Sequence, residues 1–148
     1  MSKEQDLPPC KLLLRSKESC TLYNISTSNN NNAPSASPHP TFKNVQGATL
    51  HACSPDGNLM LFQTKIGIVR RNLENGGVME DGEEKAFLEG NSTNIANISF
   101  SPLGTYILTW ERPIKPTDGS TEPPPNLKIF SSSTGKCVAG FHLKMISR

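Results

Sequence analysis

The sequence contains few aromatic residues, no long apolar run and almost no net charge. Aromatic residues make up 6% of its 148 residues, and no apolar stretch approaches the roughly 20 residues that a membrane-spanning helix requires. The formal net charge is +2, well below the strong basic excess that is typical of nucleic-acid-binding domains. The first nine residues are mostly polar and do not resemble a signal peptide. We therefore expect a cytoplasmic protein with no membrane partner.

Residues that could build a metal or disulfide site are also scarce. The four cysteines show no C-x-x-C spacing, and without a secretory signal we expect reduced thiols. His51 and Cys53 share one face of a predicted strand, but the sequence nearby supplies no further pair of zinc ligands. We therefore expect no metal and no cofactor, and we interpret Cys53 as a small buried hydrophobe beside a half-exposed His51.

No set of catalytic residues can be recognised. Ser54, Ser101 and Thr134 lie in predicted turns, and none of them occupies a G-x-S-x-G nucleophile motif. Gly76-Gly77 lacks the spacing and the lysine of a phosphate-binding loop. We predict that the chain has no catalytic residues and is not an enzyme, and a hydrolase remains only a third hypothesis.

Turn residues, in contrast, are abundant and recur with a period. Pro and Gly account for 12 and 11 residues. A Ser-Pro-x-Gly sequence occurs at Ser54–Gly57 and again at Ser101–Gly104, and both residue types suit the dihedral angles of tight turns. A repeat of about 40–45 residues with four strands is the signature of a propeller blade.

Each of the two units contains four short β-prone segments and no long helical periodicity. In the first unit they are Thr49–Cys53, Leu59–Gln63, Ile66–Arg70 and Lys85–Leu88. In the second unit they are Ile95–Phe100, Tyr106–Trp110, Leu127–Phe130 and Cys137–Leu143. We predict an all-β fold, a partial WD40-like β-propeller with about two four-stranded blades at residues 43–90 and 91–148.

The region before these units divides into two parts. Residues 1–26 are predicted to supply N-terminal strands of the propeller as a hairpin of Lys11–Arg15 and Thr21–Ile25. Residues 27–42 are rich in Asn, Pro and Ser and offer almost no apolar side chain. We predict that they form a low-complexity, disordered insert in which residues 27–40 offer no side chain that could anchor a core.

The motifs of the second unit, taken in order, resemble one protein family. They are Ser101–Trp110, then Pro125–Phe130, then the turn at Thr134–Cys137. In order and spacing they are similar to the N-terminal propeller of eukaryotic translation initiation factor 2A. Arg15–Glu18 ahead of Leu22-Tyr23 also resembles the start of that family. The resemblance covers most of residues 11–148 apart from the insert, whereas the family protein is several times longer.

The resemblance implies a role in early protein synthesis that rests on binding rather than catalysis. It implies association with the small ribosomal subunit and help in delivering initiator Met-tRNA without a requirement for GTP. Messenger RNA and other initiation factors are further implied partners. Trp110 is followed by Glu111 and not by the Asp of ordinary WD repeats. The alternative function is a WD-repeat-type scaffold fragment that binds proteins and has no role in translation.

Basic residues of the second unit are the candidate contacts to RNA. Residues 111–148 carry six basic and three acidic side chains, whereas residues 79–110 carry one basic and five acidic. The candidates for phosphate contact are Lys128, Lys136 and Lys144, with Arg70, Arg71 and Arg148 as further basic residues. The alternative is that these are ordinary solvated side chains. Trp110 could stack on a base, but we interpret it as a core residue because aromatic side chains gain much from burial.

Overall fold

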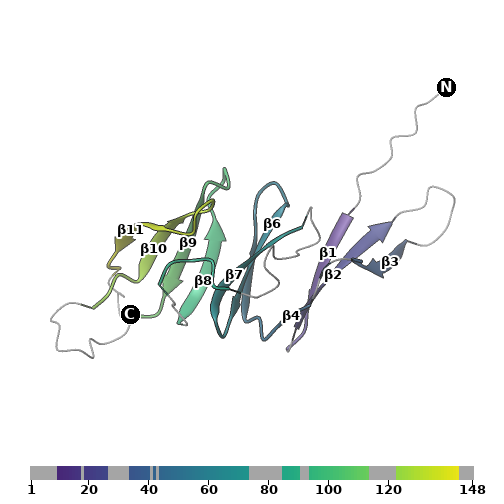
Figure 1. Ribbon diagram of the computed structural model, residues 1–148, viewed down its shortest axis with the longest axis horizontal. Coiled ribbons are helices and arrows are strands. Elements are labelled where there is room, and N and C mark those ends of the chain that lie inside the picture. The colour runs from purple at the N-terminus through teal and green to yellow at the C-terminus, as the bar shows by residue number, and fades with distance from the viewer. Residues whose placement is uncertain are drawn as a thin grey trace, which may run out of the picture.

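Three antiparallel sheets follow one another along the long axis of the molecule (Figure 1). The computed structural model describes residues 10–17, 19–26, 34–40, 42, 44–73, 85–90, 94–113 and 123–143. Within these ranges the secondary structure consists of strands and turns, and no helix is present. The prediction of an all-β, partial propeller is confirmed.

The first sheet is built around a hairpin. Its strands are β1 (Cys10–Arg15), β2 (Ser19–Ser26), β3 (Ser35–Pro38) and β4 (Val45–Gln46). β1 and β2 pair antiparallel with Leu13 opposite Leu22, which confirms the predicted N-terminal hairpin. β3 and β4 both pair with β2, β3 at its C-terminal end and β4 at its N-terminal end.

Part of the predicted disordered insert, residues 27–42, is ordered. β3 pairs with β2, with Ser26 opposite Ser35. Backbone hydrogen bonds satisfy an otherwise open strand edge, so a segment with few apolar side chains can still form a strand. Phe42 is buried, and its ring centroid lies 6.2 Å from that of Phe62. The prediction of disorder is therefore wrong for β3 and for Phe42.

The second sheet has three strands instead of the predicted four. They are β5 (Leu50–Cys53), β6 (Leu59–Thr64) and β7 (Gly67–Asn72). The fourth predicted strand, Lys85–Leu88, is irregular. A backbone hydrogen bond joins it to β7, from the Phe87 N–H to the Ile68 carbonyl (2.6 Å), whereas the Glu89 N–H donates to Gly135 of the third sheet (2.8 Å). Because its backbone groups are divided between two sheets, the segment does not form a regular ladder.

The third sheet contains the four strands predicted for the second unit. They are β8 (Ile95–Phe100), β9 (Tyr106–Glu111), β10 (Leu127–Ser131) and β11 (Cys137–Phe141). They lie side by side in chain order and are antiparallel throughout. β8 contacts β5 of the second sheet, so the first strands of the two units lie next to each other.

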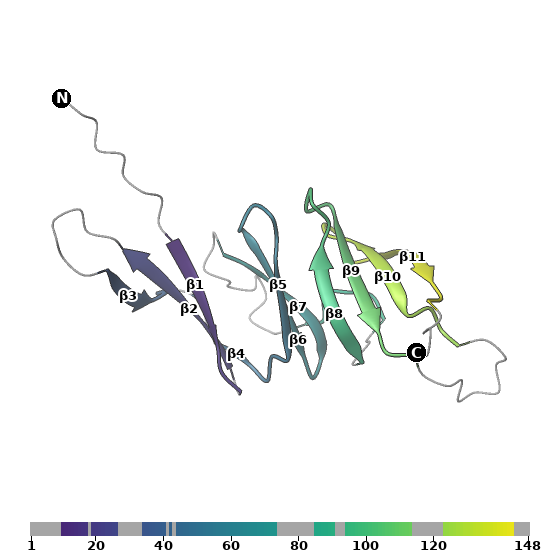
Figure 2. The same cartoon turned by 180° about the vertical axis from the view of Figure 1, so that it is seen from behind.

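The core consists of two apolar clusters that lie on the two faces of the second sheet. Between the first and second sheets the buried residues are Cys20, Leu22, Phe42, Val45, Ala48, Met60, Phe62, Val69 and Leu73. Between the second and third sheets they are Leu61, Ile68, Leu88, Ile95, Ile98, Ile107 and Phe130. β6 supplies both clusters, because successive side chains of a strand point to opposite faces. Figure 2 shows the second sheet between the other two.

The two Ser-Pro-x-Gly turns are built alike, which supports the predicted repeat. The Ser54 hydroxyl accepts a hydrogen bond from the Leu59 N–H (2.9 Å). The Ser101 hydroxyl accepts the equivalent bond from the Tyr106 N–H (3.0 Å). Each serine therefore ties the end of the first strand of its unit to the start of the second.

Candidate functional site

Lys128, the first candidate RNA contact, is held in an ion pair. Its Nζ donates to Oε1 of Glu111 at 2.8 Å, from β10 to the end of β9. The two side chains are 23% and 12% exposed. Contact with a phosphate would therefore have to compete with a partly buried carboxylate that already neutralises this charge.

Lys136, the second candidate, is exposed in the turn between β10 and β11. Its carbonyl accepts a hydrogen bond from the Ser131 N–H (2.9 Å), which places it three residues along β10 from Lys128. That spacing corresponds to about 10 Å along a strand, so the two lysines are not clustered. The third candidate, Lys144, and the further basic residue Arg148 lie outside the described residues.

Arg70 links the second sheet to the third. Its guanidinium carbon lies 4.0 Å from the centroid of the Phe87 ring, a cation–π contact. Its Nη1 also donates to the carbonyls of Ser132 (3.1 Å) and Ser133 (3.4 Å). Burial lowers the pKa of Arg70. This side chain is therefore occupied by contacts between sheets, and its neighbour Arg71 is buried.

The segment 85–90 fits closely against the turn that carries Lys136. Gly135 has a φ of +71°, and a Cβ at this position would overlap the carbonyl oxygen of Phe87. The carboxylate of Glu89 accepts a hydrogen bond from the Cys137 N–H (3.1 Å). A glycine is thus needed at position 135 for both its backbone conformation and this close approach, and the contact fixes the position of the turn.

The His51–Cys53 pair is exposed on β5, so the interpretation of Cys53 as buried is wrong. The buried cysteine is Cys20. Partial desolvation, reinforced by the charge of Asp56, raises the pKa of the Cys53 thiol, although Lys11 opposes the shift. Among the described residues no group of three His, Cys, Asp or Glu side chains could hold a metal ion. Nor do these residues include a helix with the length and hydropathy to cross a membrane.

Trp110 is half-buried and lies outside both core clusters. On β9 the buried side chains are Ile107 and Thr109, and Ile107 belongs to the cluster against the second sheet. Strand alternation directs Trp110 to the opposite face. The interpretation of Trp110 as a core residue is therefore wrong, and the tryptophan lies on the face that turns away from the second sheet.

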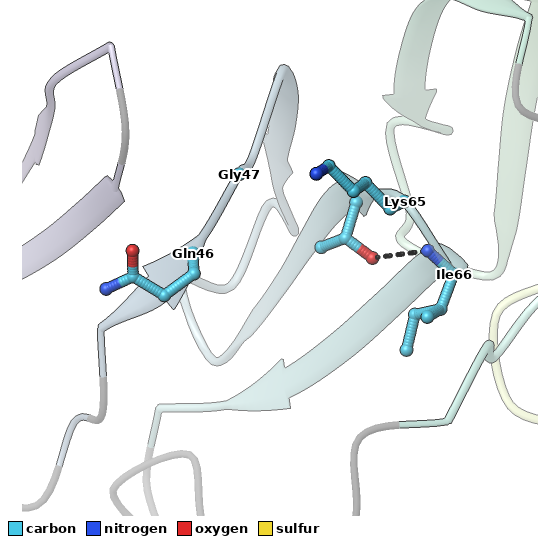
Figure 3. Close-up of a pocket in the computed structure, with 5 residues that line it drawn as sticks. Gln46, Gly47, Lys65 and Ile66 are labelled. Carbon is cyan, nitrogen blue, oxygen red and sulfur yellow. Dashed lines mark hydrogen bonds between the residues drawn. The ribbon is translucent and has the colours of Figure 1, made fainter.

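A shallow pocket lies where β4 ends beside the turn between β6 and β7 (Figure 3). It is lined by Gln46, Gly47, Thr64, Lys65 and Ile66 and has a volume of about 230 Å³. The Thr64 hydroxyl is already used, since it donates to the Gly67 carbonyl (3.1 Å) and accepts from the Ile66 N–H (3.3 Å). Small-molecule sites usually enclose about 300–1,000 Å³ with convergent polar groups, which this pocket does not offer.

The chain is similar in sequence to a curated protein. The chain is 35% identical over 107 residues to "Eukaryotic translation initiation factor 2A" of Schizosaccharomyces pombe (strain 972 / ATCC 24843). The match covers 72% of this chain and 17% of that protein, so the chain spans about a sixth of the relative's length. No protein-family model matches the chain.

Solved structures add a likeness in fold. A structure described as "Crystal structure of the eukaryotic initiation factor" superposes with a TM-score of 0.65 and 28% identity, covering 95% of this chain and 31% of that one. The β-propeller domain of the Trilobed protease from Pyrococcus furiosus gives 0.50 at 16% identity, over 92% of this chain and 44% of that one. Pyrococcus horikoshii acylaminoacyl peptidase gives 0.51 at 13%, over 95% and 26%. The two peptidase likenesses show the propeller fold alone.

Proposed function

Because this chain is a translation initiation factor-like protein, homologous to part of eukaryotic translation initiation factor 2A, we propose that it acts by binding the small ribosomal subunit and helping to deliver initiator Met-tRNA. This activity belongs in the cytoplasm, with mRNA and other initiation factors as further partners. The observation that carries the proposal is the 35% identity over 107 residues. The proposed work is binding, with no reaction catalysed.

The turn between β10 and β11 is the part of the described surface that we assign to RNA. Lys136 is exposed there, and the contacts of Arg70 and Gly135 hold the turn against the second sheet. Because the backbone of this turn is already held in place, little backbone conformational entropy is lost when its lysine meets a phosphate. Lys128 has the lesser role because Glu111 holds it, and Lys144 is included from the sequence alone.

Co-sedimentation with purified small ribosomal subunits over a series of salt concentrations tests this assignment. In Lys136→Gln one phosphate contact is lost, so the slope of log affinity against log salt should become shallower by about 0.7–0.9. Lys65→Gln is the matched control, since Lys65 is also exposed in a turn between two strands but belongs to the second sheet. The control should leave both the affinity and the slope unchanged.

Two outcomes would count against the proposal. An equal loss in both variants would show that binding responds to net charge and not to this turn. Binding that is independent of salt would favour the alternative function, a scaffold that recognises a protein surface, because protein contacts release few counterions. If binding is independent of salt, the homology to the initiation factor is unaffected, but the assignment of this turn to RNA is wrong.

A further inference from the structure

The connection between β9 and β10 is much longer than its counterpart in the second sheet. β6 and β7 are joined by the two-residue turn Lys65-Ile66, whereas residues 112–126 separate β9 from β10. Five of the 12 prolines of the chain lie between residues 113 and 125. Connections of this length are uncommon in compact domains, and loops on a rigid scaffold often carry binding residues. The added segment is therefore a candidate interaction site.

The first limb of the connection is fixed where it leaves β9. The Glu111 N–H donates a hydrogen bond to the Asn126 carbonyl (2.7 Å). The Arg112 N–H donates to the Asn94 carbonyl (3.4 Å), and Nδ2 of Asn94 donates to the Arg112 carbonyl (3.3 Å). These bonds use only the backbone of Arg112, and its guanidinium forms no ion pair with any of the described residues. Because Arg112 is exposed, its positive charge is available to a partner.

The second limb is fixed on the other side of the same opening. Nε2 of His142 donates to the Pro123 carbonyl (2.7 Å). The buried side chain of Asn126 pairs with the backbone of Leu143, accepting from its N–H (2.7 Å) and donating to its carbonyl (3.0 Å). The prolines at this end of the connection are thus held in place, while Pro123 and Pro124 remain exposed.

The three consecutive prolines Pro123–Pro125 favour one backbone conformation. A proline ring fixes φ near −65°, and a residue that precedes a proline is restricted to extended ψ values. These are the angles of the polyproline II helix, which has three residues per turn, so the stretch corresponds to one turn of it. Because proline has no N–H, the stretch cannot donate to a further strand of a sheet. It offers a partner its rings and carbonyls instead.

We propose that four exposed residues, Arg112, Pro113, Pro123 and Pro124, form a proline-rich patch that binds a protein domain of the SH3 type. Such domains hold proline-rich segments in a groove lined by aromatic side chains. A preformed polyproline II turn loses little conformational entropy when it docks. The Arg112 guanidinium favours a groove with carboxylates beside the aromatic rings, because charges of opposite sign meet across an interface.

The proline-rich patch is separate from the surface assigned to RNA. The patch lies before the start of β10, whereas the turn that carries Lys136 follows the end of β10. The two surfaces therefore lie at opposite ends of one strand. A domain docked on the patch and a phosphate bound at Lys136 use different residues, so the two activities can be tested independently.

Isothermal titration calorimetry of the full chain against a panel of purified SH3 domains tests the proposal. At least one domain should bind the unmodified chain. A variant with Pro123→Ala and Pro124→Ala should bind that domain about tenfold more weakly, because the fixed φ angles and the ring contacts are lost. Arg112→Gln should weaken binding about threefold, the usual size of an exposed charge pair. The matched control is Pro102→Ala, which removes an exposed proline from the turn between β8 and β9 and should leave binding unchanged.

The location of the contact gives a second readout. Prolines carry no amide proton, so the neighbouring amides of Arg112 and Asn126 are followed by nuclear magnetic resonance. Both signals should shift when the domain is added, and the Lys136 amide should not. A panel in which no SH3 domain binds would overturn the proposal, and so would undiminished binding by the double proline variant when circular dichroism shows that it is folded. Binding to WW or EVH1 domains alone would overturn the assigned class of partner.

Co-sedimentation with small ribosomal subunits distinguishes this patch from an RNA contact. The double proline variant and Arg112→Gln should both keep the affinity and the salt dependence of the unmodified chain. A loss of subunit binding in Arg112→Gln, with a shallower dependence on salt, would show that this arginine meets phosphate and would overturn its assignment to a protein groove.

Discussion

The second and third sheets share a repeat and differ in what covers them. In the second sheet β6 is buried from Met60 to Thr64, because the first and third sheets pack on its two faces. In the third sheet β9 alternates between buried and more exposed residues. Leu61 and Leu108 occupy equivalent positions, yet Leu61 is fully buried and Leu108 is not. Burial in such a repeat is therefore set by the neighbouring sheets and not by the sequence of the unit alone.

Removal of equivalent leucines should have the largest and most unequal effect. Leu61→Ala should lower the free energy of unfolding by about 2–5 kcal/mol, because it leaves a cavity between two sheets. Leu108→Ala should cost much less, because this side chain is only half-buried and no sheet among the described residues lies opposite it. Urea denaturation of both variants measures the difference. Equal losses would show that the two units are covered equally in solution.

The two units also differ in their fourth predicted strand, which is irregular in the first unit and regular in the second. The irregular segment 85–90 packs against Gly135, in the turn before β11. Gly135→Ala should cost more than about 1–3 kcal/mol, the usual cost of backbone strain alone, since the added Cβ overlaps the Phe87 carbonyl. The control is Gly57→Ala, where φ is +75° and nothing lies within 4 Å of an added Cβ. Thermal denaturation should show a clearly larger drop for Gly135→Ala. Similar drops would mean that segment 85–90 does not press against this turn.

The smallest expected effect distinguishes the two Ser-Pro-x-Gly turns. Hydrogen bonds from the Ser54 hydroxyl and the Asn58 N–H lower the pKa of Asp56. Because the pKa is lower in the folded state, the ionised form contributes stability above the usual aspartate range, and this contribution is lost as pH falls through the lowered pKa. The equivalent residue in the other turn is Leu103, which cannot titrate.

Nuclear magnetic resonance of backbone amides during acid titration can follow this difference. The amide of Leu59 should shift as Asp56 is protonated, whereas the amide of Tyr106 should not shift with it. Asp56→Asn should abolish the Leu59 transition and leave Tyr106 unchanged. A Leu59 transition that persists in Asp56→Asn would contradict the assignment to this carboxylate.

The strands of the fold were predictable where side-chain patterns determine them. Short apolar, β-prone runs bounded by turn residues located β1, β2 and β5–β11, and the paired turns indicated the repeat. β3 could not be predicted in this way, because backbone pairing with the open edge of β2 holds it. Lys85–Leu88 was predicted as a strand, yet the backbone hydrogen bonds of Phe87 and of the following Glu89 go to two different sheets. Long-range pairing of backbone groups leaves no local pattern in the sequence.

For the candidate RNA-binding site, the sequence predicted which lysines are present but not which of them are free of an ion pair. Lys128 and Lys136 look equivalent in the sequence, but Lys128 meets Glu111 from the neighbouring strand, and Lys136 does not. That partner is 17 residues away in the chain, across a Pro-rich loop. Trp110 was misplaced for a related reason, since strand alternation alone does not say which face of a blade has a neighbour.

Retention of initiator tRNA on small ribosomal subunits tests the central claim most directly. Labelled initiator Met-tRNA and an elongator tRNA are each incubated with purified subunits, with and without the chain, and the tRNA that co-sediments is measured. If the chain helps to deliver initiator tRNA, it should increase retention of initiator Met-tRNA and have no effect on the elongator tRNA. Binding of the chain to the subunits with no change in either tRNA, or with equal change in both, would contradict it.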